Sequence, residues 1–395
     1  MVNQHQICYI DEDLCSGCGF CQAVSYCPSP EICIGCGVCV EACPSQARSL
    51  VPDEHPHEQI TLHVDNQGVS VSERTTVLCA LENVGYTFGL TYGEADLVAP
   101  CRTGGCWGCS VLVDDGISRA CVHPIKDGMQ VDTQIPVDQQ PLRIIHGPQP
   151  HAVGGKATPW HLKGVERYIE VAIWTAGCNL RCPQCQNAST TYDGQSSPVT
   201  PEQAAHRVTD ARKRYRVDRM AISGGEPTLN RPWLIAYFNC LRELNPDPSA
   251  RLHLDSNGTV LTPDYIDELV IAGVTDIGIE PKGLEPETFM RISGISDQDL
   301  AIRFLSTAWD AIMHIAKHYS EKIFLGVGLP YNRSLITPKE VLNFGKRLAS
   351  IDSGIQLCVL DYFPTFRRQQ LKRPSLKEML NIQSLLESTG LKNVV

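Results

Sequence analysis

The sequence lacks the features of an exported, membrane-bound or nucleic-acid-binding chain. Its first residues, Met1 to His5, contain no basic start followed by an apolar run, and no stretch reaches the ~18 apolar residues that a membrane span needs. It has 34 basic and 44 acidic residues, a formal net charge of −10, and no Lys or Arg block that could follow a phosphate backbone. We therefore expect a cytoplasmic protein whose partners include neither a membrane nor nucleic acid.

Cysteine, by contrast, is plentiful. The chain has 19 cysteines in 395 residues, a length at which two or three domains are expected. Disulfide frameworks suit small secreted domains that lack a core, and this chain is long and has no export signal. In a reducing compartment, cysteines clustered at short fixed spacings usually hold metal, so the spacings carry the functional information.

Two similar cysteine runs fill the first 50 residues. Each has the spacing Cys-x2-Cys-x2-Cys and leads to a Cys-Pro pair, which resembles the bacterial two-cluster ferredoxin. Five residues separate Cys21 from Cys27 where the pattern has three, so Cys27 is the least regular ligand. Paired Cys-x2-Cys also suits tetrahedral zinc, but the Cys-Pro endings favour iron–sulfur clusters. The resemblance implies one [4Fe–4S] cluster on Cys15, Cys18, Cys21 and Cys43 and a second on Cys33, Cys36, Cys39 and Cys27.

A second group of four cysteines lies between residues 101 and 121. The first three spacings, Cys-x4-Cys-x2-Cys, match the plant-type [2Fe–2S] loop. The short gap to the fourth resembles the [2Fe–2S] domain of succinate dehydrogenase iron–sulfur subunits. Upstream, alternating residues 60–64 and 69–71 predict a hairpin and residues 76–84 a short helix. The resemblance implies a β-grasp domain with a cluster on Cys101, Cys106, Cys109 and Cys121.

The third group has only three cysteines, Cys178, Cys182 and Cys185, spaced Cys-x3-Cys-x2-Cys. A cube of four irons bound by three thiolates keeps one iron without a protein ligand, as a catalytic metal site keeps an open position. The loop follows an apolar strand expected at residues 168–174. It resembles the signature of the radical S-adenosylmethionine (SAM) superfamily, so these three cysteines are the predicted catalytic site.

Residues 168–395 alternate strand-like and helix-like segments. Strands are expected at residues 168–174, 217–222, 251–254, 276–279, 322–327 and 354–360, with helices at 231–244, 263–272 and 299–318. This alternation predicts parallel strands joined by right-handed crossovers. Six such units resemble the partial (β/α)6 barrel of the radical SAM superfamily, in which active-site residues follow the carboxyl ends of strands.

A Ser-Gly-Gly-Glu-Pro motif follows the second of these strands, at residues 223–227. Two glycines let the backbone approach a ligand closely, and a carboxylate beside them can accept from an ammonium group. In the family this motif binds the amino group of SAM. The resemblance therefore implies that Gly224, Gly225 and Glu226 are SAM contacts.

Two further motifs follow the third and fourth strands: Asp-Ser-Asn-Gly at residues 255–258 and Glu-Pro-Lys at residues 280–282. They resemble segments around SAM in the activating enzyme of pyruvate formate-lyase and its relatives, with Glu-Pro here where that family has Asp-Leu. The resemblance implies that Lys282 pairs with the SAM carboxylate. It also implies that Asp255, Ser256 and Glu280 contribute to ribose contacts or to a monovalent cation site, for which oxygen ligands are the right type.

The sequence thus predicts an α/β protein in four segments. A two-[4Fe–4S] ferredoxin domain of α+β type spans residues 1–58, a [2Fe–2S] β-grasp domain 59–135, a linker rich in proline and glycine 136–167, and a radical SAM domain 168–395. The expected cofactors are three [4Fe–4S] clusters, one of which binds SAM, one [2Fe–2S] cluster, SAM and a monovalent cation. Four further cysteines in apolar contexts are expected to be buried thiols without metal: Cys8, Cys79, Cys240 and Cys358.

Two functions of different classes fit these patterns. As an enzyme, the chain would cleave SAM to a 5′-deoxyadenosyl radical that removes hydrogen from a protein or metabolite substrate. The resemblance of residues 168–395 implies a glycyl-radical-enzyme activase, and modification of a peptide, protein or small metabolite in anaerobic metabolism is the second enzymatic hypothesis. The other clusters would carry electrons from an external low-potential donor, a ferredoxin or flavodoxin. The alternative is an electron-transfer protein with a vestigial SAM barrel, against which the intact third cysteine group and Lys282 argue.

Overall fold

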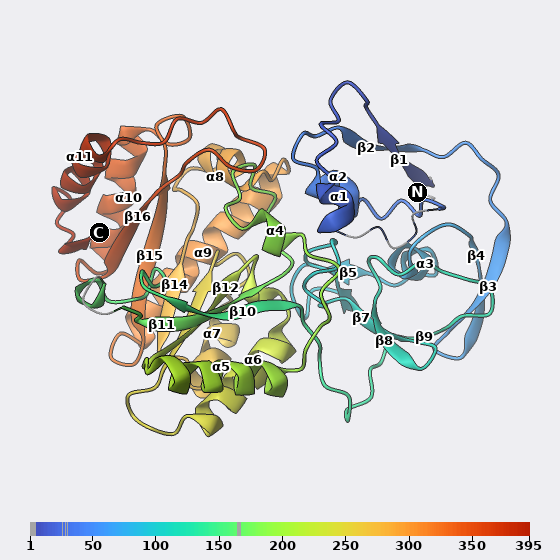
Figure 1. Ribbon diagram of the computed structural model, residues 1–395, viewed down its shortest axis with the longest axis horizontal. Helices are drawn as coiled ribbons and strands as arrows, with labels where there is room; N and C mark the ends of the chain where they lie inside the picture. The colour runs from blue at the N-terminus through green and yellow to red at the C-terminus, as the bar shows by residue number, and fades with distance from the viewer. Residues whose placement is uncertain (1–4, 26, 28, 30, 164–166) are drawn as a thin grey trace.

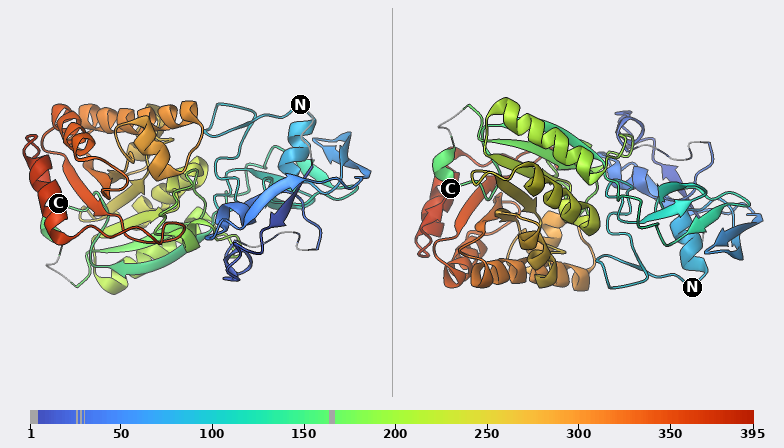
Figure 2. Two further views of the ribbon diagram at one scale, coloured as in Figure 1. Left: turned by 90° about the horizontal axis from the view of Figure 1, so that it is seen from above. Right: turned by 90° about the horizontal axis from the view of Figure 1, so that it is seen from below.

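The computed structural model describes residues 5–395 except 26, 28, 30 and 164–166. The chain forms two parts that lie side by side along the long axis of the molecule (Figures 1 and 2). The smaller part contains the first two cysteine groups. The larger part is an α/β sheet with helices around it, and it contains the third cysteine group.

The described residues up to 58 form two related halves. Strand β1 (Gln6–Ile10) pairs antiparallel with β2 (Arg48–Pro52), and helices α1 (Phe20–Ala23) and α2 (Val38–Ala42) lie between them. The backbone repeats as the sequence does: φ is 65° at both Gly17 and Gly35, and 68° and 73° at Gly19 and Gly37. Glycine enters this left-handed region without strain, so the chain turns between successive cysteines in the same way twice.

The next region is a five-stranded sheet crossed by one helix. The strand order is β4-β3-β9-β7-β8, in which β3 and β9 are parallel and the other neighbours antiparallel. The expected hairpin and helix are confirmed, the helix as α3 (Val77–Asn83), which Thr76 caps by accepting from the backbone N–H of Cys79 at 3.1 Å. The five strands are β3 (Gln59–Val64), β4 (Gln67–Ser72), β7 (Ser110–Val113), β8 (Gly116–Arg119) and β9 (Gln130–Asp132). Between α3 and β7, β5 (Phe88–Gly89) and β6 (Leu97–Val98) form a separate parallel pair.

The larger part is an open sheet in which β11 to β17 are all parallel neighbours in chain order. All six strands expected from the sequence are present, and a short seventh follows them. The strands are β11 (Glu170–Thr175), β12 (Arg219–Gly224), β13 (Arg251–Ser256), β14 (Asp276–Ile279), β15 (Phe324–Tyr331), β16 (Gln356–Asp361) and β17 (Asn393–Val394). The partial (β/α) barrel architecture predicted from the alternation is therefore confirmed.

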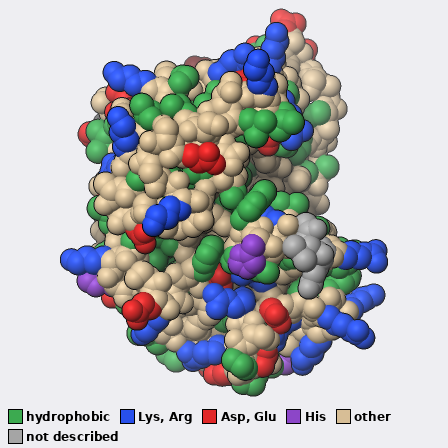
Figure 3. Space-filling model, turned by 90° about the vertical axis from the view of Figure 1, so that its left-hand side faces the viewer, with side chains coloured by type: hydrophobic (Ala, Val, Ile, Leu, Met, Phe, Trp, Pro, Cys, Tyr) green, Lys and Arg blue, Asp and Glu red, His purple; other side chains and the backbone are tan. Residues whose placement is uncertain are grey.

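Amphipathic helices cover the outside of this sheet (Figure 2). Several begin after a capping residue and have proline at the first or second helical position, which pre-sets the first turn, as after Thr200, Asn230 and Thr337. The helices are α5 (Pro201–Tyr215), α6 (Arg231–Leu244), α7 (Pro263–Ile271), α8 (Pro286–Ser293), α9 (Gln298–His318), α10 (Pro338–Ile351) and α11 (Leu376–Glu387), with the shorter α4 (Ala188–Thr191), η1 (Trp160–Leu162) and η2 (Pro227–Leu229). The face next to α10 and α11 carries basic, acidic and apolar side chains intermixed (Figure 3).

Residues 136–167, expected to be a linker, take part in the larger sheet. Strand β10 (Ile145–His151) pairs antiparallel with β11 at the sheet edge. Further on, Gly155 and Lys156 enter the barrel interior, where a β-carbon on Gly326 would lie 2.1 Å from the Lys156 carbonyl oxygen. Proline and glycine, which indicate a linker in sequence, here shape an edge strand and a close approach of two backbones. Residues 164–166 of this segment lie outside the described residues.

Candidate active site

The carboxyl ends of the parallel strands surround a cavity of about 270 Å³. Its wall is formed by loops that follow β11, β12, β13, β14 and β16, so segments spread over the whole larger part meet there. Every catalytic and cofactor-binding residue predicted from the sequence lines this one cavity. These residues are Cys178, Cys182, Cys185, Gly224, Gly225, Glu226, Asp255, Ser256, Glu280 and Lys282.

The three thiols fit a metal cluster. Burial raises the pKa of Cys182 to about 11 and also raises the pKa values of Cys178 and Cys185. The Cys178 Sγ accepts a hydrogen bond from the backbone N–H of Leu180 at 3.4 Å. Burial alone thus favours the protonated thiols, and coordination to iron would compensate the charge of the thiolates. The cavity beside them leaves room for a further ligand on the metal.

Two glycines let the end of β12 lie against the cysteine loop. A β-carbon on Gly224 would lie 2.2 Å from the Thr175 nitrogen, and one on Gly225 would lie 2.3 Å from the Gly177 oxygen. The backbone N–H groups of Gly225 and Glu226 instead donate to the carbonyls of Thr175 and Gly177, both at 2.8 Å. Any side chain at either glycine would push the motif away from the thiols.

The carboxylate of Glu226 is already satisfied by protein groups. It accepts from Thr228 Oγ1 at 2.6 Å, Ser256 Oγ at 2.8 Å and the backbone N–H of Asn257 at 2.7 Å, and the residue is 1% exposed. These bonds tie the end of β12 to the end of β13. Glu226 therefore positions the cavity wall, and its direct contact with SAM stays a prediction.

Lys282 brings a positive charge to the cavity. Its ammonium contacts the Glu280 carboxylate and lies 3.3 Å from the Tyr362 hydroxyl, which donates to Glu280 Oε1 at 2.8 Å. Burial alone would lower the pKa of Lys282, but the Glu280 carboxylate holds it well above its usual range. The group is therefore a fixed cation on the same wall as the three thiols. Tyr362 was not among the predicted residues.

Asp255 already has a cationic partner. Lys156 Nζ lies 3.3 Å from Asp255 Oδ1, and the Lys156 backbone N–H donates to the same oxygen at 3.2 Å. On the other side, His253 Nε2 lies 3.3 Å away, and Asp255 and Glu170 raise the pKa of this buried imidazole to about 9 against the effect of burial. An ammonium of the protein therefore already pairs with Asp255, and the monovalent cation expected there stays a prediction.

Replacing Lys156 by methionine is expected to create a requirement for a monovalent cation. Because Asp255 would lose its ammonium partner, SAM binding should weaken by roughly tenfold in sodium- and potassium-free buffer and recover when either salt is added. Isothermal titration of SAM across a salt series measures this. The exposed Lys339 on α10 provides the matched control, K339M. Salt-independent binding by K156M at the unaltered affinity would contradict the assignment.

Comparison with known proteins agrees with this geometry. Residues 172–333, which include the loops after β11 to β14, match the radical SAM superfamily. The chain contains a radical SAM domain. Residues 57–136 match a 2Fe–2S iron–sulfur cluster binding domain, and residues 26–49 match a 4Fe–4S binding domain. The latter match includes the second cysteine run and Cys27, and the first run lies outside it.

Curated relatives of the radical SAM domain include proteins with different substrates. An AdoMet-dependent heme synthase from Methanosarcina barkeri is 32% identical over 121 residues, 31% of this chain and 33% of that protein. A GTP 3′,8-cyclase from Petrotoga mobilis is 27% identical over 199 residues, 50% of this chain and 56% of that protein. The chain therefore spans about a third to about half of the length of these relatives.

Two solved structures resemble part of the chain. SuiB of Streptococcus suis bound to S-adenosylmethionine has a TM-score of 0.43 at 14% identity, with 55% of this chain and 47% of that one covered. Coproporphyrinogen III oxidase (HemN) of Escherichia coli has a TM-score of 0.33 at 20% identity, with 48% and 46% covered.

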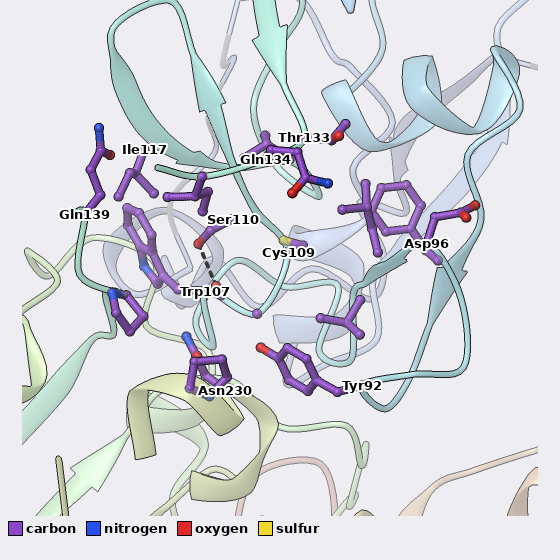
Figure 4. A pocket seen from close by; sticks show the side chains of 18 of the residues that line it. Tyr92, Asp96, Trp107, Cys109, Ser110, Ile117, Thr133, Gln134, Gln139 and Asn230 are labelled. Carbon is purple, nitrogen blue, oxygen red and sulfur yellow. Dashed lines mark hydrogen bonds between the residues drawn. The ribbon is translucent and has the colours of Figure 1, made fainter. Parts of the chain in front are cut away.

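The four cysteines of the second group also fit a cluster. All four are buried, and their thiols interact with one another. The backbone N–H groups of Thr103 and Gly108 donate to the sulfurs of Cys101 and Cys106, both at 3.4 Å. On its outer side the loop borders a second cavity of about 530 Å³, where Cys109 lies between Trp107 and Tyr92 (Figure 4).

Cys8 lies among the ligands predicted for the second ferredoxin cluster. Its Sγ is 3.4 Å from the Cys39 Sγ and 3.5 Å from Arg48 Nη1, and its backbone N–H donates to the Cys33 Sγ at 3.3 Å. Cys27 lies close enough to Cys36 for the two thiols to interact electrostatically. Once Cys39 is a thiolate, the Cys8 thiol is placed to donate a hydrogen bond to it. Cys8, expected to be a buried thiol without metal, is half-buried and lies beside a predicted ligand. That it binds no metal itself stays a prediction.

Replacing Cys8 by alanine is expected to lower the midpoint potential of this cluster. Hydrogen bonds to cluster sulfurs favour the reduced, more negative state. Losing one hydrogen bond of ~0.5–1.5 kcal/mol should lower the potential by about 20 to 65 mV, since 59 mV corresponds to a tenfold change in the equilibrium constant of a one-electron reduction. Redox titration followed by EPR measures the shift, and C240A on α6 is the control. An unchanged potential with full iron content would rule out this role.

Within the described residues, no three His, Cys, Asp or Glu side chains converge closely enough to bind a single metal ion. Nor does any helix in the described part of the chain combine the length and apolar character needed to cross a bilayer.

Three residues of the site were not predicted from the sequence, and they differ in whether a sequence pattern could have indicated them. Asn257, whose amide lies 3.1 Å from Asn179 on the cavity wall, was inside a motif already singled out. Tyr362 follows β16, so the rule that active-site residues follow barrel strands would have found it. Lys156 carried no such signal, because only the fold brings the segment before β11 into the barrel.

Proposed function

We propose that this chain is a radical SAM enzyme that cleaves SAM to methionine and a 5′-deoxyadenosyl radical, which removes hydrogen from a protein or metabolite substrate. The observation that carries the proposal is the single cavity onto which three thiols, the Gly-Gly motif and the Lys282 ammonium open. When bound by three thiolates, a [4Fe–4S] cluster supplies an iron that can chelate SAM and the electron that cleaves its sulfonium.

The protein groups have distinct tasks in this proposal. Cys178, Cys182 and Cys185 hold the cluster. The Gly224–Gly225 backbone approaches the amino end of SAM, and the protonated Lys282 pairs with its carboxylate while Glu280 and Tyr362 hold the ammonium in place. Ser256 and Asp255 line the wall where the ribose would lie.

The cofactor set we propose is three [4Fe–4S] clusters, one [2Fe–2S] cluster and SAM, and the monovalent cation expected from the sequence stays a prediction. The first two cysteine groups would hold the clusters that carry electrons toward the SAM site. The matched iron–sulfur domains and the burial of the second cysteine group support this division of labour. The electrons would come from an external low-potential donor, a ferredoxin or flavodoxin.

Two substrate classes remain in the proposal. Installation of a glycyl radical on a protein is favoured by the Asp-Ser-Asn-Gly and Glu-Pro-Lys motifs, which rest on sequence likeness alone. A small metabolite is favoured by the names of the relatives, a heme synthase and a cyclase of GTP. Hydrogen removal by the same radical serves either class, so the cavity chemistry does not depend on the choice.

The test is anaerobic reconstitution with iron and sulfide, followed by reaction with SAM and dithionite. The proposal predicts 5′-deoxyadenosine and methionine in equal amounts. A pure electron carrier would be reduced reversibly and would release neither. Supplying perdeuterated protein and perdeuterated metabolite fractions separately then identifies the substrate class, because deuterium enters 5′-deoxyadenosine only from the fraction that contains the substrate.

A further inference from the structure

We propose that Arg181 fastens the [2Fe–2S]-binding loop to the SAM-cluster loop, and that the electron for SAM cleavage arrives from that loop. The inference deepens the proposed function and rests on it. In this step one electron leaves the reduced [2Fe–2S] centre, which is oxidised, and converts [4Fe–4S]2+ to [4Fe–4S]+. No bond or proton changes place, and the external low-potential one-electron donor restores the first centre.

Arg181 touches all three cysteine-bearing regions. Its Nη1 donates to the carbonyl of Cys178 and its Nη2 to the carbonyl of Cys101, both at 2.7 Å, while its Nε lies 3.0 Å from Glu41 Oε2 on α2. The guanidinium presents its donors in a rigid fork, so three acceptors held by one arginine are fixed relative to one another. Two of the three acceptors are backbone atoms of predicted cluster ligands. The side chain is thus at the junction of the electron-carrying and SAM-binding regions.

At this junction the two loops touch through glycine backbone. A β-carbon on Gly105 would lie 2.4 Å from the Gly177 nitrogen, and one on Gly177 would lie 2.4 Å from the Cys106 nitrogen. Gly177 directly precedes Cys178, and Gly105 directly precedes Cys106. Asn230, which caps α6, also donates to the Cys106 carbonyl at 3.2 Å. Neither loop has space for a side chain at these glycines, so Cys106, a predicted ligand of one cluster, packs against the residue that directly precedes Cys178, a predicted ligand of the other.

The ferredoxin-like region also contacts the SAM loop, through side chains. Glu41 pairs with Arg181, and Ala42 lies in the same apolar cluster as Cys185. Arg367 donates to the carbonyls of Glu41 at 2.7 Å and Cys43 at 3.0 Å, and its own backbone N–H donates to Pro183 in the SAM-cluster loop at 2.9 Å. This path runs along a whole arginine side chain and two hydrogen bonds. The [2Fe–2S] loop is distinguished by backbone contact: Gly177 packs against Cys106, and Arg181 donates to the carbonyl of Cys101. On this contact we assign the [2Fe–2S] loop as the last electron carrier before SAM.

The outer side of the [2Fe–2S] loop borders a cavity. Cys109 lines the 530 Å³ cavity between this region and the barrel (Figure 4). A donor that binds at this cavity would lie beside Cys109, a predicted ligand, although Cys109 is buried. The loop thus lies between a surface cavity and the SAM-cluster loop, as an entry point for electrons requires.

The first test measures magnetic interaction rather than turnover. In the reduced, fully loaded protein we expect the EPR signal of the [2Fe–2S] centre to relax rapidly, because a second paramagnetic cluster is near. In protein with Cys178, Cys182 and Cys185 all changed to alanine, the same signal should relax more slowly. An identical microwave-power saturation curve in the two proteins would overturn the proposal, since it would place the SAM cluster too far away.

The second test compares R181M and R181K with the exposed-residue control R207M. For each, 5′-deoxyadenosine release is driven either by dithionite or by an enzymatically reduced flavodoxin. We expect the ratio of flavodoxin-driven to dithionite-driven release to fall about tenfold in R181M, less in R181K, and not in R207M. An unchanged ratio in R181M with full iron content would overturn the proposal. Absence of product with both reductants in unaltered protein would instead refute the proposed function.

Discussion

Protein with Cys182 replaced by alanine is expected to release 5′-deoxyadenosine at least ~10³-fold more slowly than the unaltered protein, that is, at background level. The reason is geometric. Cys182 lies between the other two thiols in sequence and on the same cavity wall, so its loss removes one of only three protein ligands of the SAM cluster. Quantifying 5′-deoxyadenosine after anaerobic reduction with dithionite measures the effect.

Iron content distinguishes loss of the site from loss of the fold. C182A should contain about four fewer irons per chain than unaltered protein, while the signals of the other clusters persist. Replacement of Cys240, a half-buried cysteine of α6 away from the cavity, serves as the control and should change neither iron content nor product. Unaltered turnover by C182A would mean that SAM is cleaved elsewhere.

Replacing Lys282 by methionine is expected to weaken SAM binding by about 10- to 100-fold. The ammonium is the positive charge that Glu280 and Tyr362 hold on the cavity wall, and a hydrogen bond to a charged group is worth ~1.5–3 kcal/mol. Methionine keeps much of the length and apolar bulk of lysine while removing the charge. Isothermal titration of SAM into reconstituted protein measures the dissociation constant.

Controls separate the lost charge from a collapsed wall. K282R keeps a cation and should retain more affinity than K282M, and K339M on the outer helix α10 should bind SAM as the unaltered protein does. Because K282M also leaves Glu280 beside a neutral side chain, its thermal stability should be measured in parallel. Equal affinity of K282M and unaltered protein for SAM would remove Lys282 from the binding site.

The barrel and its site could be predicted from the sequence because the patterns that indicate them are local and periodic. Each parallel strand is an apolar run followed by a polar motif, so the positions of β11 to β16 and the cavity residues after them follow from one rule. The cysteine spacings act in the same way, since a tight glycine-containing loop fixes the reach between successive ligands. The three thiols and Lys282, more than 90 residues apart, meet where that rule places them.

The contacts between regions could not be predicted from the sequence, because they depend on how separate elements pack against one another. The Gly-Gly-Lys segment before β11 resembles a linker in sequence, yet Lys156 lies at 3.3 Å from Asp255 inside the barrel. Arg181 is one of three residues between Cys178 and Cys182, and its bonds to Cys101 and Glu41 span 80 and 140 positions. No periodicity records such pairs, just as none places Cys8 of β1 beside Cys39.

The proposed function depends most on the one iron of the cluster that three thiolates leave without a protein ligand, where SAM would bind. The most direct measurement is the EPR spectrum of anaerobically reconstituted, reduced protein recorded before and after SAM is added. We expect the signal of one [4Fe–4S]+ cluster to change its g-values on SAM addition, and this response to be missing in protein with Cys178, Cys182 and Cys185 all changed to alanine. A spectrum that SAM leaves unchanged in the fully loaded, unaltered protein would contradict the account.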